Sequence, residues 1–181
     1  MTDYNERIKR VLYTEEQIAA AVKEAGRAIS EKYAGKPLLL VGFLKGSFVF
    51  MADLCRAVDA PCEIGFMAAK SYYSGTTSSG NVKITMDLDQ DISKYHVVIV
   101  EDIIDSGVTL SYLAKYLLGK GAKSVRTCTL LDKPSRREVE FVPDFSGATI
   151  PDEFVIGYGL DFDEKYRNLP FVGVLKPEMY S

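Results

Sequence analysis

The sequence predicts an α/β fold, with a mainly parallel, twisted sheet flanked by helices. Continuous apolar runs such as 38–44 and 97–100 suit strands that are buried on both faces, as parallel strands are. Amphipathic segments lie between these runs, and the alternation of strand and helix indicates parallel connections. At 181 residues, with 47% hydrophobic and 26% charged residues, the chain is expected to form one domain over 1–181.

The first half of the chain contains two predicted helices and two predicted strands. Thr14 opens a Thr-Glu-Glu-Gln capping box, and apolar residues follow at helical spacing to about Tyr33. Further along, the patterns predict a strand over 38–44, a helix over 48–58, a strand over 62–69 and a polar loop over 70–81. A central parallel strand is thus followed by a helix and a second strand.

The second half of the chain shows the same alternation of predicted strands and helices. The patterns indicate, in order, a strand at 82–86, a strand at 97–100, a helix at 109–118 and a strand at 125–131. Beyond Pro134 we expect irregular chain, with one short apolar run at 154–157. The adjacent Arg136 and Arg137 predict a charge cluster in solvent or at a subunit contact.

Composition and charge favour small-molecule chemistry over nucleic-acid or membrane binding. The formal net charge of -3 gives no overall positive field. No apolar run approaches the roughly 18 residues that a membrane-spanning helix needs. Three cysteines and a single histidine offer no metal-ligand spacing and predict reduced thiols. We therefore expect a cytoplasmic protein that binds neither nucleic acid nor membranes.

The segment 97–110 joins a buried strand to a helix through acidic, hydroxyl and glycine residues. In open α/β sheets, ligands bind at this carboxyl end of the strands. The helix N-terminus exposes backbone N–H groups, Gly107 allows a close approach of the backbone, and Ser106 and Thr109 add hydroxyl donors. The pattern is typical of a monophosphate-binding loop, and it matches neither the Walker P-loop nor the Gly-x-Gly-x-x-Gly dinucleotide motif.

Three carboxylates accompany this loop. Glu101 and Asp102 are suited to accept the two hydroxyls of a sugar diol, and Asp105 is close enough in sequence to share that ligand. Phosphate donors beside diol acceptors indicate a ribose phosphate. The alternative is that the acids only cap the helix and solvate a loop, but three acids directly after an apolar strand exceed what capping requires.

The same segment resembles the phosphoribosyl diphosphate binding motif of type I phosphoribosyltransferases, and specifically that of hypoxanthine-guanine phosphoribosyltransferases. The resemblance covers nearly the whole chain. The family's other landmarks are matched in the correct order by Leu44-Lys45-Gly46-Ser47, Ser71-Tyr72, Leu130-Leu131-Asp132-Lys133-Pro134 and the segment 150–158, with Asp161 and Arg167 beyond it. Several ordered motifs are far more specific than one.

The resemblance implies the type I phosphoribosyltransferase fold, with a small hood built from terminal segments and including about 140–181, and a flexible lid over 70–81. It implies transfer of 5-phosphoribosyl from 5-phospho-α-D-ribose 1-diphosphate (PRPP) to hypoxanthine or guanine, which gives IMP or GMP and pyrophosphate. Magnesium is the implied cofactor, because a hard cation neutralises the diphosphate oxygens. A homodimer or homotetramer is implied as well.

The resemblance also implies a role for each matching residue. Asp105 is implied as the catalytic general acid/base near N7 of the purine. The ribose- and phosphate-binding residues would be Glu101, Asp102, Asp105, Ser106, Gly107, Val108 and Thr109. The pyrophosphate-binding residues would be Lys45, Gly46 and Arg167, with a cis peptide before Lys45. The base-binding residues would be Lys133, Phe154, Val155 and Asp161, the lid residues Ser71 and Tyr72, and the metal-binding residues Glu101, Asp102 and Asp161.

Other interpretations remain at this point. Taken singly, Lys45, Lys133 and Phe154 also fit a solvated turn, a surface charge and a core strand. A xanthine- or orotate-type transferase would use the same ribose phosphate loop with a different hood. A non-catalytic regulator that senses PRPP and acts on nucleic acid would need an extended basic surface, which the net charge of -3 does not indicate.

Overall fold

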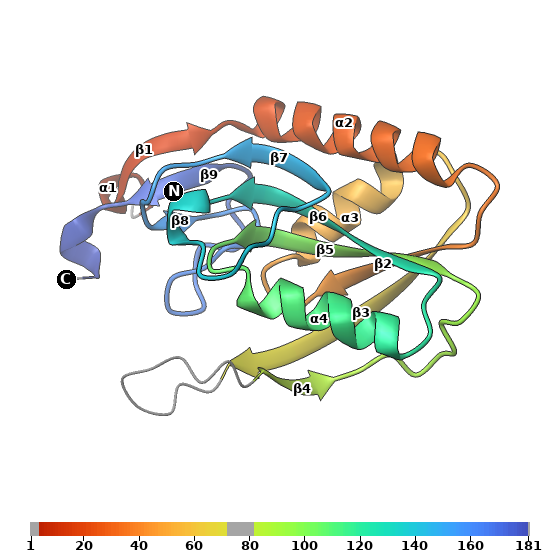
Figure 1. Ribbon diagram of the computed structural model, residues 1–181. Helices are drawn as coiled ribbons and strands as arrows, with labels where there is room; N and C mark the ends of the chain where they lie inside the picture. The colour runs from red at the N-terminus through yellow and green to blue at the C-terminus, as the bar shows by residue number, and fades with distance from the viewer. Residues whose placement is uncertain (1–3, 72–81, 181) are drawn as a thin grey trace.

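A six-stranded sheet forms the centre of the molecule (Figure 1). The computed structural model describes residues 4–71 and 82–180. The strand order is β4-β3-β2-β5-β6-β7, and all neighbours are parallel except the antiparallel edge pair β3 and β4. The strands are β2 (Leu38–Phe43), β3 (Cys62–Ser71), β4 (Val82–Met86), β5 (His96–Ile104), β6 (Ser124–Asp132) and β7 (Phe145–Thr149). The predicted α/β class with a mainly parallel sheet is confirmed.

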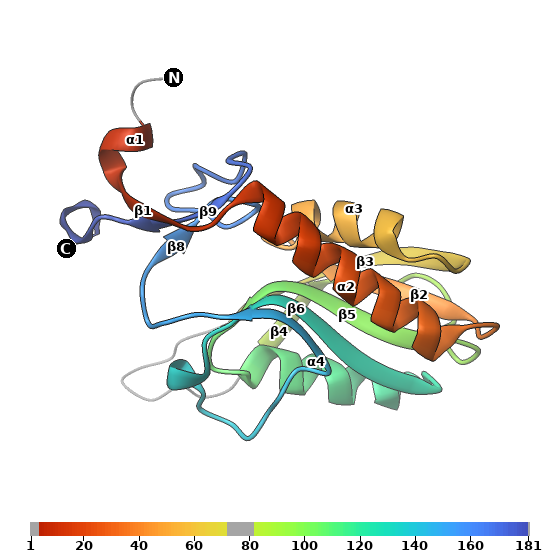
Figure 2. The ribbon, with the colours of Figure 1, turned by 90° about the horizontal axis from the view of Figure 1, so that it is seen from above.

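Helices cover both faces of this sheet. Figure 2 shows α2 (Glu15–Tyr33) and α3 (Phe48–Ala57) on one face and α4 (Val108–Gly119) on the other. Val98 and Val100 of β5 pack under α2 and α3, whereas Val97 and Ile99 pack against the α4 side. Burial on both faces explains why the central strands are continuous apolar runs rather than alternating ones.

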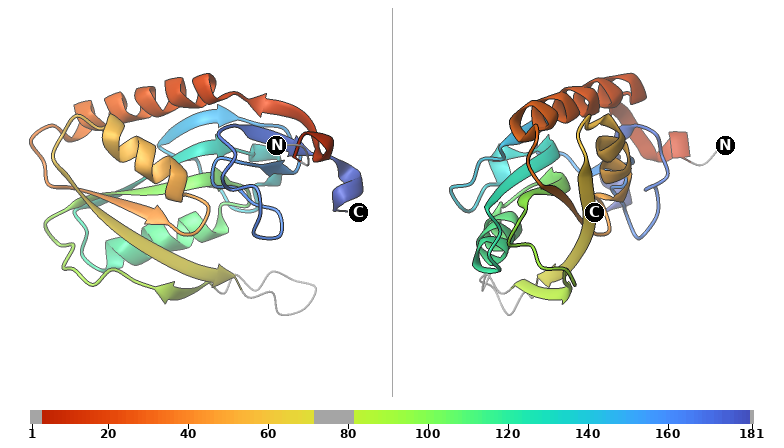
Figure 3. Two further views of the ribbon diagram at one scale, coloured as in Figure 1. Left: turned by 180° about the vertical axis from the view of Figure 1, so that it is seen from behind. Right: turned by 90° about the vertical axis from the view of Figure 1, so that its right-hand side faces the viewer.

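A smaller antiparallel sheet forms the hood at the carboxyl ends of the main strands. Its order is β1-β9-β8, with β1 (Ile8–Tyr13), β8 (Val155–Ile156) and β9 (Val172–Leu175). The short helices α1 (Tyr4–Arg7) and η2 (Pro177–Met179) lie beside it, so the first and last described segments are both part of this end of the molecule (Figure 3). The short helix η1 (Pro134–Arg136) follows β6. The hood is built from terminal segments, as predicted.

The boundaries of the hood differ from the predicted range of about 140–181. Segment 145–149 pairs with β6 as an edge strand of the main sheet, and it therefore lies outside the hood. The hood instead takes β1 from the N-terminal part, where the sequence analysis predicted no strand. The predicted lid lies largely outside the described residues, because only Lys70 and Ser71 are described, at the end of β3.

The chain order places a topological switch point between β2 and β5. From β2 the chain passes through α3 to β3 on one side, and from β5 it passes through α4 to β6 on the other side. Open α/β sheets bind their ligands at such a switch point, outside the carboxyl ends of the strands. Both the Lys45–Gly46 turn and the loop before α4 follow the carboxyl ends of these two strands.

No helix in the described ranges 4–71 and 82–180 combines the length and the apolar character that crossing a bilayer requires. The three cysteines are free thiols, and Cys128 among them is buried. The free thiols agree with the reduced cysteines predicted from the sequence.

The capping box at Thr14 gives a first testable prediction. Thr14 Oγ1 accepts the Gln17 N–H at 3.3 Å, and Gln17 Oε1 accepts the Thr14 N–H at 2.9 Å. Thr14→Ala should lower the free energy of unfolding by about 1 kcal/mol, because an N-terminal N–H of α2 loses its partner. Urea unfolding measures this change. The double variant Thr14→Ala/Gln17→Ala should cost less than the two single variants together, and strict additivity would contradict the reciprocal pair.

Candidate active site

The loop between β5 and α4 is shaped to bind an anion. Gly107 adopts φ 78° and ψ -9° as the N-cap of α4, a left-handed conformation that favours glycine. A Cβ on Gly107 would also meet Cδ of Arg137 at 3.0 Å and Cγ2 of Val139 at 3.2 Å. Ser106 Oγ accepts the Val108 N–H at 3.3 Å. Since no acidic residue stands in the first turn of α4, its positive N-terminus remains available to a phosphate.

The two acids before this loop lie within β5 and not after it. The predicted apolar run ended at residue 100, whereas the strand continues to Ile104 and so includes both Glu101 and Asp102. Asp102 is 6% exposed, and its Oδ1 accepts the Ile103 N–H at 2.8 Å. Glu101 Oε2 is buried and has no hydrogen-bond partner among the described residues. Burial raises the pKa of both carboxyl groups, and the neighbouring Asp102 carboxylate adds to the rise of the Glu101 pKa.

Asp102 packs directly against the turn that follows β2. The peptide bond between Leu44 and Lys45 is cis, as the resemblance implied. A Cβ on Gly46 would lie 1.8 Å from Asp102 Oδ2, so only glycine fits between this carboxylate and the turn. On the other side, a Cβ on Gly159 would lie 2.0 Å from Gly46 O. The turn is therefore clamped between β5 and the segment after β8.

The two predicted pyrophosphate ligands converge beside this turn. Lys45 Nζ lies 2.9 Å from Glu164 Oε2, and Arg167 Nη2 lies 3.5 Å from the same oxygen. Arg167 also pairs with Asp161 Oδ1 at 2.9 Å and donates from Nη1 to Gly159 O at 2.8 Å. The hydrogen bond from Lys45 lowers the pKa of Glu164, so this carboxylate balances the two cations. The sequence analysis did not predict a role for Glu164.

Lys133 and Asp105 form the next part of the site. The Lys133 side chain is only 9% exposed, and its Nζ lies 3.5 Å from Asp105 Oδ1. The same Nζ donates to Glu153 O at 3.1 Å, and the Lys133 N–H donates to Ile104 O at 3.0 Å. Lys133 is therefore not the surface charge that its place at a strand end would suggest, but a buried cation held between β5 and the hood.

Phe154 supplies an aromatic face at the edge of the hood. It is 38% exposed and stacks on Tyr180, with ring centroids 5.0 Å apart and an interplanar angle of 26°. Phe162 meets the ring edge-on, with centroids 5.7 Å apart. The next residue, Val155, is buried in β8, which is the edge strand of the hood sheet. One side of the β8 backbone is thus not paired with a neighbouring strand.

The structure brings together most of the predicted site residues, but not the two lid residues and not the three predicted metal ligands. Tyr72 lies outside the described residues, and Ser71 is the last residue of β3. Glu101, Asp102 and Asp161 do not gather into a metal-binding cluster, since the described residues contain no such group of three or more ligands. Instead, Asp161 Oδ2 accepts the Glu164 N–H at 2.9 Å while Oδ1 faces Arg167.

Three residues of the site were missed by the sequence analysis. Arg137 was assigned to a solvated or subunit-contact cluster, but its side chain is 15% exposed and binds the phosphate loop. Glu153 holds Lys133 through its carbonyl oxygen and binds Lys9 at 3.3 Å through its carboxylate. Arg137 and Glu164 stand outside the motifs used above, and Glu153, although it lies in the segment 150–158, acts on Lys133 through a backbone carbonyl, for which the identity of its side chain gives no signal. Arg136, in contrast, is 61% exposed, as predicted.

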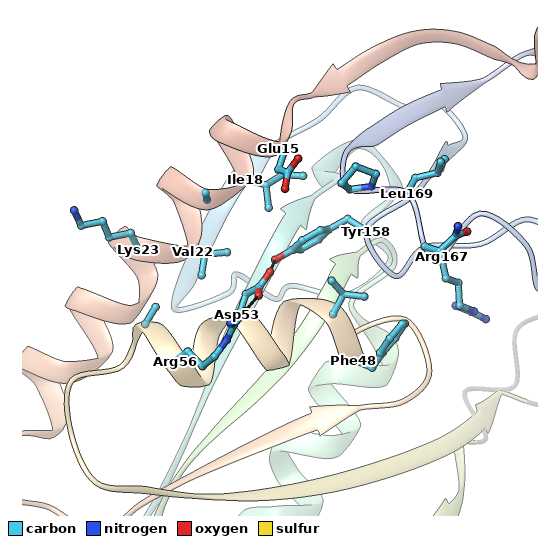
Figure 4. A pocket seen from close by; sticks show the side chains of 15 residues that line it. Glu15, Ile18, Val22, Lys23, Phe48, Asp53, Arg56, Tyr158, Arg167 and Leu169 are labelled. Atoms are coloured by element: carbon cyan, nitrogen blue, oxygen red, sulfur yellow. Dashed lines mark hydrogen bonds and ion pairs between the residues drawn. The ribbon is translucent and has the colours of Figure 1, made fainter. Parts of the chain in front are cut away.

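A separate cavity of about 680 Å³ opens between α2, α3 and the segment 158–170 (Figure 4). Its walls are largely apolar, and Tyr158 donates to Asp53 Oδ2 at 2.5 Å inside it. The phosphate loop does not line this cavity, and Arg167 at its edge is its only link to the candidate active site among the described residues. The cavity therefore lies outside the site described above.

The switch point, the glycine-centred loop and the paired cations define an α/β protein whose site suits a phosphorylated ligand. Residues 11–163 match the family model described as "Phosphoribosyl transferase domain", and the chain belongs to this family. A hypoxanthine-guanine phosphoribosyltransferase of Lactococcus lactis is 51% identical over 174 residues, which cover 96% of this chain and 94% of that protein.

Two further relatives extend the comparison. The bifunctional protein TilS/HprT of Listeria monocytogenes is 49% identical over 174 residues, and the match spans 96% of this chain but only 27% of that longer protein. The crystal structure of a hypoxanthine phosphoribosyltransferase from Staphylococcus aureus superposes with a TM-score of 0.96 at 46% identity, covering 100% of this chain and 99% of that one. The family resemblance noted in the sequence is therefore confirmed over the full fold.

Proposed function

We propose that this chain transfers the 5-phosphoribosyl group of PRPP to hypoxanthine or guanine, releasing pyrophosphate. The observation that carries the proposal is the grouping of three binding features at the carboxyl ends of the central strands. These are the loop at Gly107, the cation pair at Lys45 and Arg167, and the buried Lys133, which donates to the carbonyl oxygen of the residue before Phe154. They suit the phosphate, the diphosphate and the oxopurine of the two substrates.

The 5-phosphate would bind at the loop from Asp105 to Thr109. The N–H groups at the start of α4 and the hydroxyls of Ser106 and Thr109 are donors for it. The Glu101 carboxylate would accept the ribose hydroxyls, because its buried Oε2 has no described partner and a hydroxyl donor would satisfy it. Asp102 would also accept a ribose hydroxyl, and its carboxylate packs against Gly46.

The base would lie between Phe154 and the Asp105–Lys133 pair. The Lys133 ammonium would donate to the exocyclic oxygen at C6, which hypoxanthine and guanine carry and adenine lacks. Stacking on Phe154 would hold the purine plane, and the unpaired backbone edge at Val155 would contact its rim, with Asp161 beyond. Asp105, with a half-exposed side chain, would take the proton from N7 as the bond to C1 of the ribose forms.

The pyrophosphate would bind at Lys45, Gly46 and Arg167. When the diphosphate enters, its oxygens would replace Glu164 as the partner of both cations. Mg²⁺ fits this site, because it is usually held by one or two carboxylates together with substrate phosphates rather than by a protein cage. The orphaned Glu101 Oε2 and the absence of a three-ligand cluster among the described residues agree with that mode. When bound, the ion would neutralise charge on the leaving diphosphate.

Pyrophosphate release tests the proposal directly. The protein is mixed with PRPP, Mg²⁺ and one of hypoxanthine, guanine, xanthine, adenine or orotate, and the assay is repeated with the metal chelated. We expect Mg²⁺-dependent release with hypoxanthine or guanine and none with adenine or orotate. Release chiefly with xanthine would change the assigned substrate. Binding of PRPP without release for any base would instead favour the sensing regulator.

A substitution at Lys133 tests the assignment of the base. Lys133→Met keeps the buried aliphatic stem and removes the ammonium, so kcat/KM for hypoxanthine should fall by about 10-fold or more, the value of one charged hydrogen bond. The KM for PRPP should stay unchanged. Lys115→Met on the exposed face of α4 is the matched control. An equal loss of kcat/KM for hypoxanthine and for PRPP would show that Lys133 affects the whole site and not only the binding of the base.

Two properties are proposed from the family resemblance alone. We expect a homodimer or homotetramer in the cytoplasm. Sedimentation equilibrium of the purified chain measures the first property, and a purely monomeric protein at micromolar concentration would contradict it.

A further inference from the structure

Four successive carbonyl groups, from Ile104 at the end of β5 to Gly107 in the phosphate loop, all accept hydrogen bonds. Ile104 O accepts the Lys133 N–H at 3.0 Å and Arg137 Nη1 at 3.4 Å. Asp105 O accepts the same Arg137 Nη1. Ser106 O accepts the N–H groups of Glu138 at 3.0 Å and Val139 at 3.4 Å, and Gly107 O accepts the Ser111 N–H at 2.9 Å. The segment after η1 therefore provides partners for three of these four carbonyls.

The orientation of these carbonyls fixes the direction of the neighbouring N–H groups. In a trans peptide the C=O of one residue and the N–H of the next point in opposite directions. The N–H groups of Asp105 and Ser106 must therefore point away from Arg137, and the N–H group of Gly107 must point away from Glu138 and Val139. No residue within 4–71 or 82–180 accepts a hydrogen bond from any of these three N–H groups. They form a concave set of unpaired donors, which is the arrangement that binds an anion.

The side chain of Arg137 is fixed by its own contacts. Its Nη2 donates to Asp132 Oδ1 at the end of β6, and both side chains are 15% exposed. The Cδ of Arg137 also packs 3.0 Å from the position that a Cβ on Gly107 would occupy. The neighbouring Arg136 turns outward instead and pairs with Asp152 at 2.8 Å, with 61% of its side chain exposed. Two adjacent arginines thus have different environments, and only Arg137 contacts the loop.

We propose that Arg137 is a positioning residue that turns the peptides of the phosphate loop so that their N–H groups face the 5-phosphate. It acts through the carbonyls of Ile104 and Asp105 and does not touch the substrate. Its planar guanidinium can serve these carbonyls from one nitrogen and Asp132 from another, which a lysine ammonium at the end of a flexible stem cannot reproduce. The inference rests on the proposed function, because that function places the 5-phosphate at this loop.

The test compares Arg137→Met, Arg137→Lys and Arg136→Met by kinetics in both directions. PRPP and IMP share the 5-phosphate, whereas pyrophosphate and hypoxanthine do not contain it. Arg137→Met should raise the KM for PRPP and for IMP by about 10-fold or more, as expected for lost hydrogen bonds from a charged group. The KM for pyrophosphate and for hypoxanthine should stay at the wild-type value. Arg137→Lys should give an intermediate increase, and Arg136→Met should give none.

Two outcomes would overturn the proposal. The first is an Arg137→Met protein with a lowered Tm but an unchanged KM for PRPP, because Arg137 would then only support the fold. The second is an Arg137→Lys protein with the wild-type KM for PRPP, and this measurement decides the matter if the methionine variant does not fold. Failure of the proposed function would look different, because the wild-type protein itself would then release no pyrophosphate. In that case calorimetric titration with PRPP still measures the effect of Arg137 on the loop.

Discussion

Asp105→Asn is expected to lower kcat by about 100-fold or more, the usual contribution of a general acid/base, while the KM for PRPP stays close to that of the wild type. The two side chains have the same shape, but the amide cannot accept the purine proton. The Asp105 carbonyl would remain bound to Arg137, so the backbone of the phosphate loop should keep its conformation. The expected change is therefore confined to the chemical step. Pyrophosphate release at saturating PRPP and base measures it.

A control is needed because Asp105→Asn also removes a charge beside Lys133. Asp152→Asn removes an equivalent charge from an exposed pair with Arg136 and should leave kcat unchanged. The double variant Asp105→Asn/Lys133→Met should lose less than the product of the two single losses, since the two side chains lie 3.5 Å apart in one site. Unchanged turnover in Asp105→Asn would remove the assignment of Asp105 as the general acid/base.

Local sequence patterns were sufficient for five of the six strands of the main sheet and for the helices that cover it. The helix at 15–33 follows from a capping box and a clear helical period, and the strand at 38–43 follows from an apolar run buried on both faces. These signals are local, because the spacing of apolar residues within one segment shows which face of the helix or strand is buried. The alternation of strand and helix indicated a mainly parallel sheet, but the order of the strands and the switch point came from the structure.

Strands β1 and β7 could not be predicted in this way. Strand β1 carries Lys9 and Arg10 in its centre, and its partner β9 is more than 150 residues away in the sequence. Strand β7 is an edge strand and contains Ser146 and Gly147. Because its side chains are only partly buried, its sequence is not a continuous apolar run. Their pairing depends on contacts with distant residues, and the sequence pattern of each segment alone is weak.

The site shows the same division. Gly107 and the acids around it were predicted because a strand, a glycine and a helix N-terminus follow one another in the chain. The burial of Lys133 depends on Glu153, twenty residues later, and the role of Arg137 depends on carbonyls more than thirty residues earlier. Neither residue differs in local pattern from a surface charge, so only the fold could separate Arg137 from its solvated neighbour Arg136.

Gly46→Ala is expected to have the second large effect, a loss of about 100-fold in kcat/KM for PRPP from a small displacement within the site. The new Cβ would stand 1.8 Å from Asp102 Oδ2 and 2.6 Å from its Cγ, so either the turn or the carboxylate must move. Asp102 is 6% exposed and cannot turn into solvent. The turn cannot retreat either, because Gly46 O already lies against Gly159. Both the ribose and the pyrophosphate parts of the site should therefore be displaced together.

Steady-state kinetics and calorimetric titration with pyrophosphate measure this loss. Gly119→Ala is the matched control, because no atom lies within 4 Å of the added methyl group and the site is remote. Gly159→Ala should reproduce the loss from the opposite side of the turn, since its Cβ would press on Gly46 O and its φ is +100°. Circular dichroism separates a displaced turn from an unfolded chain. A folded Gly46→Ala protein with normal pyrophosphate affinity would show that Lys45 and Gly46 do not form the diphosphate site, and the cation pair with Glu164 would then be only a surface contact.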